Sequence, residues 1–423
     1  MGFSRDPGGR ALLGGVPLEP LLGRAPTPFY AYDLDGVAGR ARRLAEGFGA
    51  RDHRIFYAIK ANSAGPLLAR LRDEGLGVDV VSGGELRLCL RLGFLPERII
   101  FSGVGKSDAE LDLALGAGPE GIGALQAESV EELGRVEARA RALGRTARVS
   151  LRLNPDVEAG AHAHIATGHD EAKFGIPFRD LDAALDEVAR RPALRLGGLA
   201  THIGSQMTSI APYERAAERL CEAARRWLDR GFGLDFLDFG GGYGVDYGGG
   251  CEAEPADFAR AALGALDRAG LGRLRAHCEP GRALVAPEGA LVTRVVQVKR
   301  WRHPETAGWL FTDAGMHTLL RPALYGARHR IEALGAPPGR GPEAAWRLAG
   351  PVCESSDEFG TYRLPDPPPE ALVVRDAGAY GYTMASLYNG HGLPSEVFLE
   401  GGRVRSVRRA LDAEAWAEER AKL

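Results

Sequence analysis

Short apolar segments alternate with stretches of helical spacing over the middle of this chain, from about residue 54 to about residue 279. Glycine, proline or polar residues bound the apolar segments, which is typical of buried strands, and the stretches between them carry apolar residues three and four positions apart. Eight strands are predicted in this way, at 55–60, 78–81, 98–101, 122–125, 149–153, 198–202, 236–239 and 275–279. Because eight parallel strands alternating with helices can close on themselves, we predict an α/β fold of the (β/α)8, TIM-barrel type.

The pattern changes after Gly281. Pro-rich loops intervene, and short strand-like segments follow one another without long helices, at 292–298, 309–312, 371–375 and 396–399. This pattern predicts a C-terminal, mostly-β domain. The segment 28–32 also reads as a strand, and because it precedes the barrel we expect it to join the β domain. The predicted domains are therefore a barrel at 44–285 and a β domain formed by 1–43 with 286–423.

Composition excludes several classes of function. The net charge is -3 without long runs of like charge, so no nucleic-acid partner is expected, and no stretch is long and apolar enough to span a membrane. The first residues lack the apolar core of a signal peptide. The five cysteines, which are Cys89, Cys221, Cys251, Cys278 and Cys353, are scattered and never in Cys-x-x-Cys spacing. We therefore expect a cytoplasmic protein with a small-molecule ligand, without disulfides or a metal.

Polar residues gather where the predicted strands end. Six of the eight strands end at or just before such residues, namely Lys60, Asp79, Arg152, His202, Gly240 to Gly242 and Glu279. A (β/α)8 barrel builds its site from the loops at the carboxyl ends of its strands. These residues are therefore the candidate site.

Lys60 ends the apolar run 54–59, which predicts a lysine in a buried environment. Burial disfavours the ammonium form and lowers the pKa of a lysine, so the amine becomes a nucleophile that can form an imine. The alternative is a lysine that simply reaches solvent from a strand end.

The run Gly240-Gly241-Gly242 follows a buried strand and offers backbone amides without side chains, as phosphate sites do. The segment Glu279-Pro280-Gly281-Arg282 would add further amides and a cation. A phosphate site opposite a nucleophilic lysine suggests pyridoxal 5'-phosphate. Glu279 would then face the pyridine nitrogen and His202 would stack on the ring. The alternatives are an ion pair between Glu279 and Arg282, and a core histidine.

Ten motifs, in order along nearly the whole chain, resemble those of the diaminopimelate decarboxylases. That family belongs to the barrel-type pyridoxal phosphate-dependent decarboxylases, which have the alanine racemase-like fold. The motifs are Tyr57–Asn62, Val81–Leu86, Asn154–Asp156, Lys173–Ile176, His202–Gln206, Gly240–Gly242, Glu279–Arg282, Arg321–Tyr325, Gly350–Ser355 and Gly378–Gly381.

The resemblance implies roles for individual residues. Lys60 would hold the cofactor covalently, and His202 would assist catalysis. The phosphate and ring would be bound by Ser205, Gly240, Gly241, Gly242, Glu279, Gly281, Arg282 and Tyr380, with Asp79 and Arg152 as supports. It also implies a homodimer with shared sites, in which Cys353 and Glu354 reach the site of the other subunit and Cys353 returns a proton after carbon dioxide leaves.

A diacid substrate follows from the residues that the resemblance places around it, which are Arg282, Arg321, Tyr325, Glu354 and Tyr380. Each arginine can grip a carboxylate through two hydrogen bonds, and Glu354 can pair with a remote ammonium. We therefore expect the conversion of meso-diaminopimelate to L-lysine and carbon dioxide, in lysine biosynthesis.

Two segments depart from the family pattern. His317-Thr318 stands where the family usually has Asn-Asp, and His391-Gly392-Leu393 stands where it usually has Arg-Pro-Arg. These departures leave open an enzyme that acts on another amino acid, or an acyl-linked one, in a specialised biosynthetic pathway.

Other classes of protein are disfavoured. His162, His164, His169, Lys173 and His202 could belong to a metal-dependent amidohydrolase, but its His-x-His pair belongs at the first strand and here follows the fifth. Retention of Lys60, Cys353 and Glu279 argues against a non-catalytic binding protein. A racemase on this fold would need an arginine in place of Glu279, opposite the pyridine nitrogen.

Overall fold

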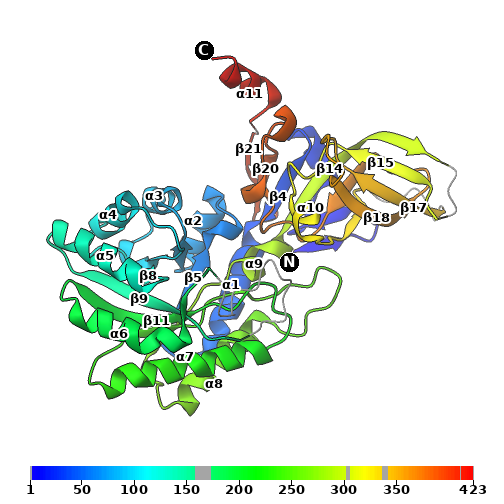
Figure 1. Ribbon diagram of the computed structural model, residues 1–423. Coiled ribbons are helices and arrows are strands. Elements are labelled where there is room, and N and C mark those ends of the chain that lie inside the picture. The colour runs from blue at the N-terminus through cyan, green and yellow to red at the C-terminus, as the bar shows by residue number, and fades with distance from the viewer. Residues whose placement is uncertain (1, 158–172, 302–304, 336–341, 410, 423) are drawn as a thin grey trace. The chain divides into compact units, whose positions relative to one another are not determined.

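The computed structural model describes residues 2–157, 173–301, 305–335, 342–409 and 411–422 (Figure 1). The chain forms two compact units. One comprises Arg40–Val245 and Cys251–Ala283, and the other comprises Met1–Gly39, Asp246–Gly250 and Leu284–Leu423. The first boundary falls inside helix α1 (Leu34–Phe48).

The first unit is a closed barrel of eight parallel strands. They are β5 (His53–Ala58), β6 (Gly77–Val80), β7 (Ile99–Phe101), β8 (Ala124–Ala127), β9 (Ala147–Asn154), β11 (Leu194–Thr201), β12 (Phe236–Asp238) and β13 (Arg275–Cys278). Neighbours in the chain pair in parallel, and β13 pairs with β5 to close the ring. The short β10 (Ile176–Pro177) pairs with the end of β9. The predicted barrel is confirmed.

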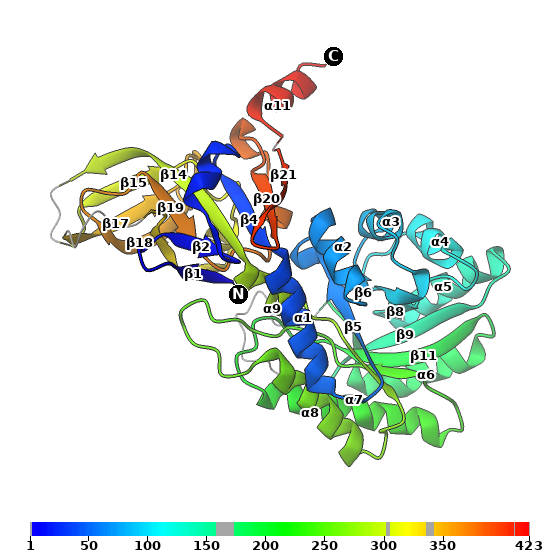
Figure 2. The same cartoon turned by 180° about the vertical axis from the view of Figure 1, so that it is seen from behind.

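Helices cover the outside of the barrel strands, as Figures 1 and 2 show. They are α2 (Gly65–Asp73), α3 (Gly83–Arg91), α4 (Asp108–Gly116), α5 (Val130–Ala142), α6 (Leu181–Arg190), α7 (Ala211–Asp229) and α8 (Pro255–Arg268). Serine hydroxyls start three of them, because Ser82, Ser107 and Ser129 each accept a hydrogen bond from an amide in the first turn. None of the described helices combines the length and the apolar composition that crossing a membrane takes.

The barrel interior is packed with apolar side chains away from the polar strand ends. Phe56, Ile100, Ala124 and Phe236 form one buried cluster. His277 on β13 stacks on the ring of Phe236, with centroids 4.1 Å apart and planes within 14°. Burial and the nearby arginines hold the pKa of His277 well below its usual range, so this histidine is a neutral member of the core.

The second unit is a mixed sheet domain. Its main strands are β4 (Phe29–Asp33), β14 (Gly289–Arg300), β15 (Gly308–Thr312), β16 (Ile331–Ala333), β17 (Glu343–Ala349), β18 (Glu358–Pro365), β19 (Ala371–Val374), β20 (Ser395–Glu400) and β21 (Arg403–Arg408). Strand β4 pairs with β14 antiparallel and with β20 parallel. This pairing confirms that the N-terminal strand joins the β domain.

Smaller elements complete the second unit. A three-stranded sheet of β1 (Phe3–Arg5), β2 (Ala11–Leu13) and β3 (Val16–Pro17) packs Ala11, Leu13 and Val16 into the core shared with β4 and β14. The helices are α10 (Arg321–Tyr325) and α11 (Ala413–Arg420), with α9 (Arg282–Val285) at the boundary of the units. Single turns of 3-10 helix connect elements in both units, at Glu19–Gly23, Ile59–Ala61, Pro96–Arg98, Phe178–Asp180, Ala286–Glu288, Tyr382–Met384 and Tyr388–Gly390.

Candidate functional site

Lys60 lies one turn beyond its strand. Strand β5 ends at Ala58, and the turn Ile59–Ala61 brings the Lys60 side chain to the carboxyl end of the barrel, where it is 41% exposed. The buried environment predicted for Lys60 is therefore wrong, because the residue belongs to the turn and not to the apolar strand. Its Nζ lies 3.6 Å from Oδ2 of the buried Asp79, whose other oxygen accepts a hydrogen bond from Ser102.

Backbone hydrogen bonds gather three strand ends around Glu279. The amide of Ala58 donates to Pro280 O, and the amide of Glu279 donates to Gly240 O. The lysine turn, the glycine run and the end of β13 are thereby held at one edge of the barrel. This is the arrangement that the strand-end rule predicts.

Glu279 is surrounded by other carboxylates. It is 8% exposed, and its pKa is raised well above the usual range, chiefly by burial and further by Asp238 and Asp79. Burial likewise raises the pKa of Asp238 to about 7. The amide of Gln126 donates a hydrogen bond of 2.9 Å to Oε1 of Glu279. Lys60 and Arg152 supply positive charge that opposes the shift of Glu279.

Arg152 and His202 lie at the ends of β9 and β11. The guanidinium of Arg152 pairs with Glu128 at 2.9 Å, and both side chains are buried. Burial, Arg152 and Lys60 hold the pKa of His202 well below its usual range, so its ring is neutral. The amide of Gly241 donates to His202 Nδ1 at 3.2 Å.

The glycine run is packed too closely for any side chain. A Cβ atom on Gly240, Gly241 or Gly242 would overlap a backbone oxygen of Thr201, Glu279 or Gly204, respectively. Two of its amides are engaged inside the protein, since that of Gly240 donates to Asp238 and that of Gly241 to His202. The run therefore brings strand ends together at close range, besides any ligand contacts it makes.

Arg282 and Ser205 lie together at the carboxyl edge of the barrel, where Arg282 supplies a positive charge. Arg282 Nη2 donates to Ser205 Oγ at 2.9 Å. A Cβ atom on Gly281 would lie 3.1 Å from Ala61 and 3.3 Å from Ala58, closer than ordinary van der Waals contact. A guanidinium and a hydroxyl suit a phosphate group, Lys60 offers a primary amine, and Glu279 offers an acidic partner for a ring nitrogen. The donor set thus fits pyridoxal phosphate.

The remaining predicted residues belong to the second unit. Arg321 starts α10, is buried and donates to His329 Nε2 at 2.7 Å, while the other nitrogen of His329 bonds to Arg375 O. Tyr325 ends the same helix and is half-buried. Cys353 and Glu354 are exposed on the loop between β17 and β18, and Tyr380, also half-buried, has a φ of 56°.

The two departures from the family pattern lie together in this unit. The rings of His317 and His391 are 4.6 Å apart. Burial and His391 lower the pKa of His317 to about 4. Asn389, two residues before His391, accepts a hydrogen bond from the amide of Cys353 at 3.0 Å. The residues just before the altered segment are therefore in contact with the loop that carries Cys353 and Glu354.

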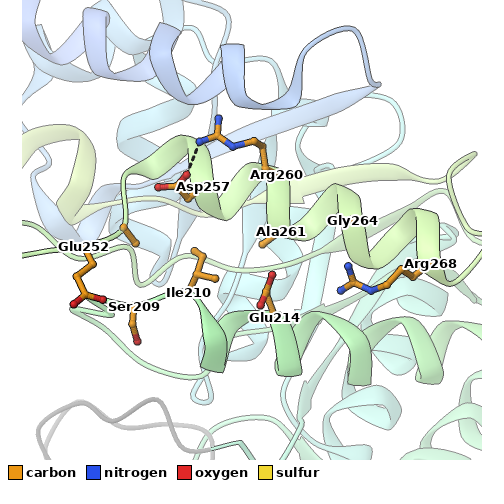
Figure 3. A pocket seen from close by; sticks show the side chains of 10 residues that line it. Ser209, Ile210, Glu214, Glu252, Asp257, Arg260, Ala261, Gly264 and Arg268 are labelled. Atoms are coloured by element: carbon orange, nitrogen blue, oxygen red, sulfur yellow. Dashed lines mark hydrogen bonds and ion pairs between the residues drawn. The ribbon is translucent and has the colours of Figure 1, made fainter.

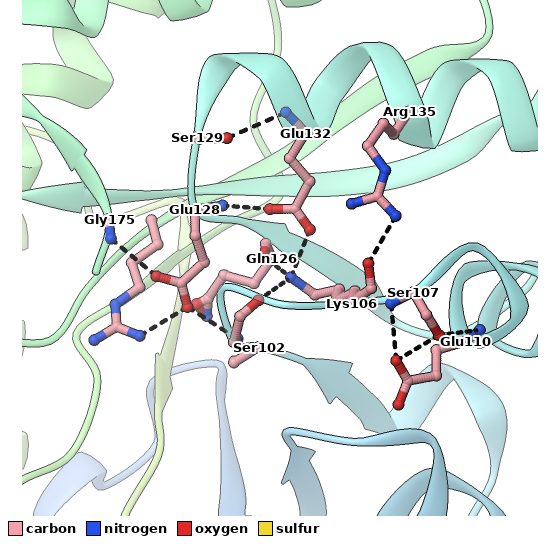
Figure 4. A network of polar contacts seen from close by, with 12 residues as sticks. Ser102, Lys106, Ser107, Glu110, Gln126, Glu128, Ser129, Glu132, Arg135 and Gly175 are labelled. Atoms are coloured by element: carbon pink, nitrogen blue, oxygen red, sulfur yellow. Dashed lines mark hydrogen bonds and ion pairs between the residues drawn. The ribbon is translucent and has the colours of Figure 1, made fainter. Parts of the chain in front are cut away.

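A buried polar network beside Glu279 was missed by the sequence reasoning (Figure 4). Lys106 Nζ donates to Gly103 O, Gln126 O and Glu132 Oε1, at 2.7, 2.7 and 2.8 Å. Glu132 also accepts from the amide of Glu128. Ser102, Gln126 and Glu128 stand at the ends of β7 and β8, so the strand-end rule that found the other six strand ends could have found them.

A cavity of about 530 Å³ lies between α7 and α8 (Figure 3). Its lining residues are Ser209, Ile210, Glu214, Glu252, Ala253, Asp257, Arg260, Ala261, Gly264 and Arg268. None of these is a predicted site residue. The cavity is therefore separate from the candidate site at the strand ends.

The residues of the rival metal site, His162, His164 and His169, lie outside the described residues. Within the part of the chain that the structure describes, no three His, Cys, Asp or Glu side chains gather as ligands of a metal ion would.

Comparisons with known proteins agree with this geometry. The family model described as "Pyridoxal-dependent decarboxylase, pyridoxal binding domain" matches residues 34–286. The chain is 38% identical to diaminopimelate decarboxylase of Zymomonas mobilis over 405 residues, covering 94% of each chain. It is 39% identical to that of Pseudomonas aeruginosa over 400 residues, covering 93% of each.

Solved structures give the same result. Diaminopimelate decarboxylase from Helicobacter pylori, complexed with L-lysine, superposes with a TM-score of 0.88 at 36% identity, over 96% of this chain and 100% of that one. The enzyme from M. jannaschii, in co-complex with L-lysine, superposes with a TM-score of 0.91 at 28% identity, over 100% and 98%.

Proposed function

The chain belongs to the diaminopimelate decarboxylases, within the pyridoxal-dependent decarboxylases, and from this premise we propose that the residues at the carboxyl end of its barrel bind and activate pyridoxal phosphate. It is accordingly a pyridoxal phosphate-dependent amino-acid decarboxylase. The observation that carries the site assignment is the convergence of Lys60, Asp79, Arg152, Glu279 and the Arg282–Ser205 pair at one edge of the barrel.

The chemistry that bound pyridoxal phosphate would supply is an electron sink for decarboxylation at the substrate's α-carbon. Lys60 is the covalent anchor, and Asp79 at 3.6 Å steadies its amine. Arg282, Ser205 and the glycine run bind the phosphate, with Gly281 and Tyr380. Glu279 holds a proton at the ring nitrogen, Arg152 supports the site through Glu128, and the neutral ring of His202 offers a face for stacking.

The proposed substrate is meso-diaminopimelate, and the proposed product is L-lysine. Arg321 and Arg282 are assigned to carboxylates and Glu354 to the distant ammonium, with Tyr325 and Tyr380 beside them. The similarity to diaminopimelate decarboxylases over more than nine tenths of the chain supports this choice.

The alternative is another amino acid or an acyl-linked one. It is favoured by a single observation, the contact of the altered His317 and His391 with each other beside the Cys353 loop.

We further propose a homodimer in the cytoplasm, with Cys353 and Glu354 acting in the site of the other subunit. Cys353 would return the proton to the α-carbon. The exposure of both side chains supports this, since neither is used in the core of its own unit. A subunit-mixing experiment, in which Lys60→Ala and Cys353→Ala chains restore activity together, tests the shared site. No recovery of activity would contradict the shared site.

The domain limits 44–285, and 1–43 with 286–423, stay a prediction.

Carbon dioxide release by purified protein tests the function directly. The substrates to compare are meso-diaminopimelate, L-lysine, L-ornithine, L-arginine and acyl derivatives of the first. We expect turnover of meso-diaminopimelate to exceed the others by at least about a hundredfold, because L-lysine, L-ornithine and L-arginine lack the second carboxylate assigned to the arginines, and an acyl derivative lacks the free ammonium assigned to Glu354.

Reduction with borohydride, followed by peptide mass mapping, tests the anchor independently of substrate. A pyridoxyl adduct on Lys60 is expected. An unmodified Lys60 in protein that binds the cofactor would contradict the assignment.

A further inference from the structure

Glu279 stands in an unfavourable place for an anion. It is buried, Asp238 and Asp79 are close enough to raise its pKa, and Asp238 is itself fully buried. Adjacent buried carboxylates tend to share protons, since two unshielded like charges cannot both ionise cheaply. Lys60 and Arg152 offset part of this repulsion, and an ionised Glu279 needs hydrogen-bond donors directed at its own oxygens as well.

Gln126 provides such a donor. Its Nε2 lies 2.9 Å from Oε1 of Glu279, and Gln126 is 1% exposed. An amide donor aimed at a carboxylate stabilises the ionised form and makes the oxygen less basic.

The position of Gln126 is itself fixed from the other side. Its backbone oxygen accepts a hydrogen bond of 2.7 Å from Lys106 Nζ, and Lys106 is 3% exposed and paired with Glu132 (Figure 4). A buried ammonium with three oxygen partners is costly to displace. Lys106 thus anchors the end of β8, from which the Gln126 amide extends to Glu279.

We propose that Gln126 is a positioning residue that keeps Glu279 ionised and oriented, so that the proton shared with the cofactor's ring nitrogen stays on that nitrogen. This inference rests on the proposed function. Without the Gln126 donor, Glu279 becomes more basic and takes the proton, and the ring loses its positive charge. A neutral ring accepts electrons less readily, so kcat falls while the groups that bind substrate are unchanged.

The test uses Gln126→Leu, which keeps the approximate volume and removes the donor. The holoenzyme is loaded with pyridoxal phosphate labelled with ¹⁵N in the ring, and the ¹⁵N chemical shift reports directly where the proton lies. We expect the shift to move from the protonated toward the unprotonated range, and kcat to fall about tenfold or more with KM changed less than about threefold.

Gln297→Leu is the matched control, because it makes the same change at an exposed position of β14 and should leave both readouts unaltered. Gln126→Asn is the second variant, to be used if the leucine protein does not fold. Its shorter side chain withdraws the donor from Glu279, so an intermediate shift is expected.

A ¹⁵N shift equal to that of the wild type in a folded Gln126 variant overturns the inference. A wild-type protein that neither binds the labelled cofactor nor releases carbon dioxide would instead overturn the proposed function.

Discussion

The candidate residues of the barrel and those on the Cys353 loop of the second unit are held in opposite ways. In the barrel, Asp79, Arg152 and Glu279 are buried, and each is bonded to a side chain from another strand end. In the second unit, Cys353 and Glu354 are exposed on one loop. That loop is held by backbone amides, which bond to Asn389 and Asp357.

The buried barrel residues and the exposed loop residues suit two different tasks. A cofactor that is anchored covalently needs partners with fixed positions and protonation states, and closely packed strand ends provide them. Residues that select a substrate, or act in a neighbouring subunit, can stand on a loop whose length and sequence vary without disturbing a core. Four substitutions test this contrast.

Lys60→Ala should abolish turnover, because the exposed amine assigned as the anchor is lost, while the nearby Lys106 is buried and its Nζ is engaged by three oxygens. The absorbance of the bound cofactor should change with it, since the covalent link is lost. Both are measured on purified protein reconstituted with pyridoxal phosphate, with thermal unfolding as a check of the fold. Activity within tenfold of the wild type would show that the barrel edge does not carry the chemistry.

Arg321→Ala should lower kcat/KM for meso-diaminopimelate by about a hundredfold, as expected for losing a charged two-point contact. Use of L-lysine, which lacks the second carboxylate, should fall much less. Arg321→Lys is the control, because lysine keeps the positive charge but lacks the planar guanidinium that makes two hydrogen bonds to a carboxylate. Equal losses on both substrates would remove Arg321 from substrate selection.

Asp357→Ala should loosen the Cys353 loop. Asp357 is buried and accepts hydrogen bonds from the amides of Met316 and Val352, at 2.6 and 2.8 Å. We expect a loss of about 2 kcal/mol in the free energy of unfolding and a changed rate of alkylation at Cys353.

Glu358→Gln is the neighbouring control for Asp357→Ala. Its carboxylate pairs with Arg347 at a half-exposed position, where the loss should stay below about 1 kcal/mol. An alkylation rate unaffected by Asp357→Ala would show that the loop is held by other contacts.

Asp238→Asn should change how stability depends on pH. The pKa of Asp238 is raised from 3.8 to about 7, so its contribution to stability is complete below about pH 4 and is lost as the pH rises through 7. The Asn variant should therefore lose less stability than the wild type between pH 4 and pH 7.

Urea unfolding of the two apo-proteins at several pH values measures this difference. His202 and His277, whose lowered pKa values act in the opposite direction below about pH 6.5, contribute equally to both proteins. Parallel stability profiles would mean that Asp238 is ionised throughout this range.

Much of the fold could be predicted because buried parallel strands are apolar along their whole length. Every predicted barrel strand overlaps an observed one. Strands β18 and β21 were missed because most of their side chains are half or fully exposed, and β21 alternates arginine with valine and serine. Such segments carry little apolar signal, and their pairing with β17 and β20 makes them strands.

The site was predicted less completely than the fold. The strand-end rule found Lys60 and Glu279, which follow their strands, and Asp79, which lies inside strand β6 near its end. It did not reveal that Lys60 is 41% exposed in a turn. Nor did it find Gln126, whose role depends on the distance to a residue 153 positions away in the chain.

The sequence alone determined the barrel, the β domain and the residue types at each strand end, because apolar periodicity and local turns are properties of neighbouring residues. Which oxygen of Glu279 receives a donor, which glycine amides are already bonded and which carboxylate keeps a proton depend on tertiary contacts. Those outcomes depend on distances of about 3 Å between strand ends that are far apart in the chain, and on how much water each charge has lost.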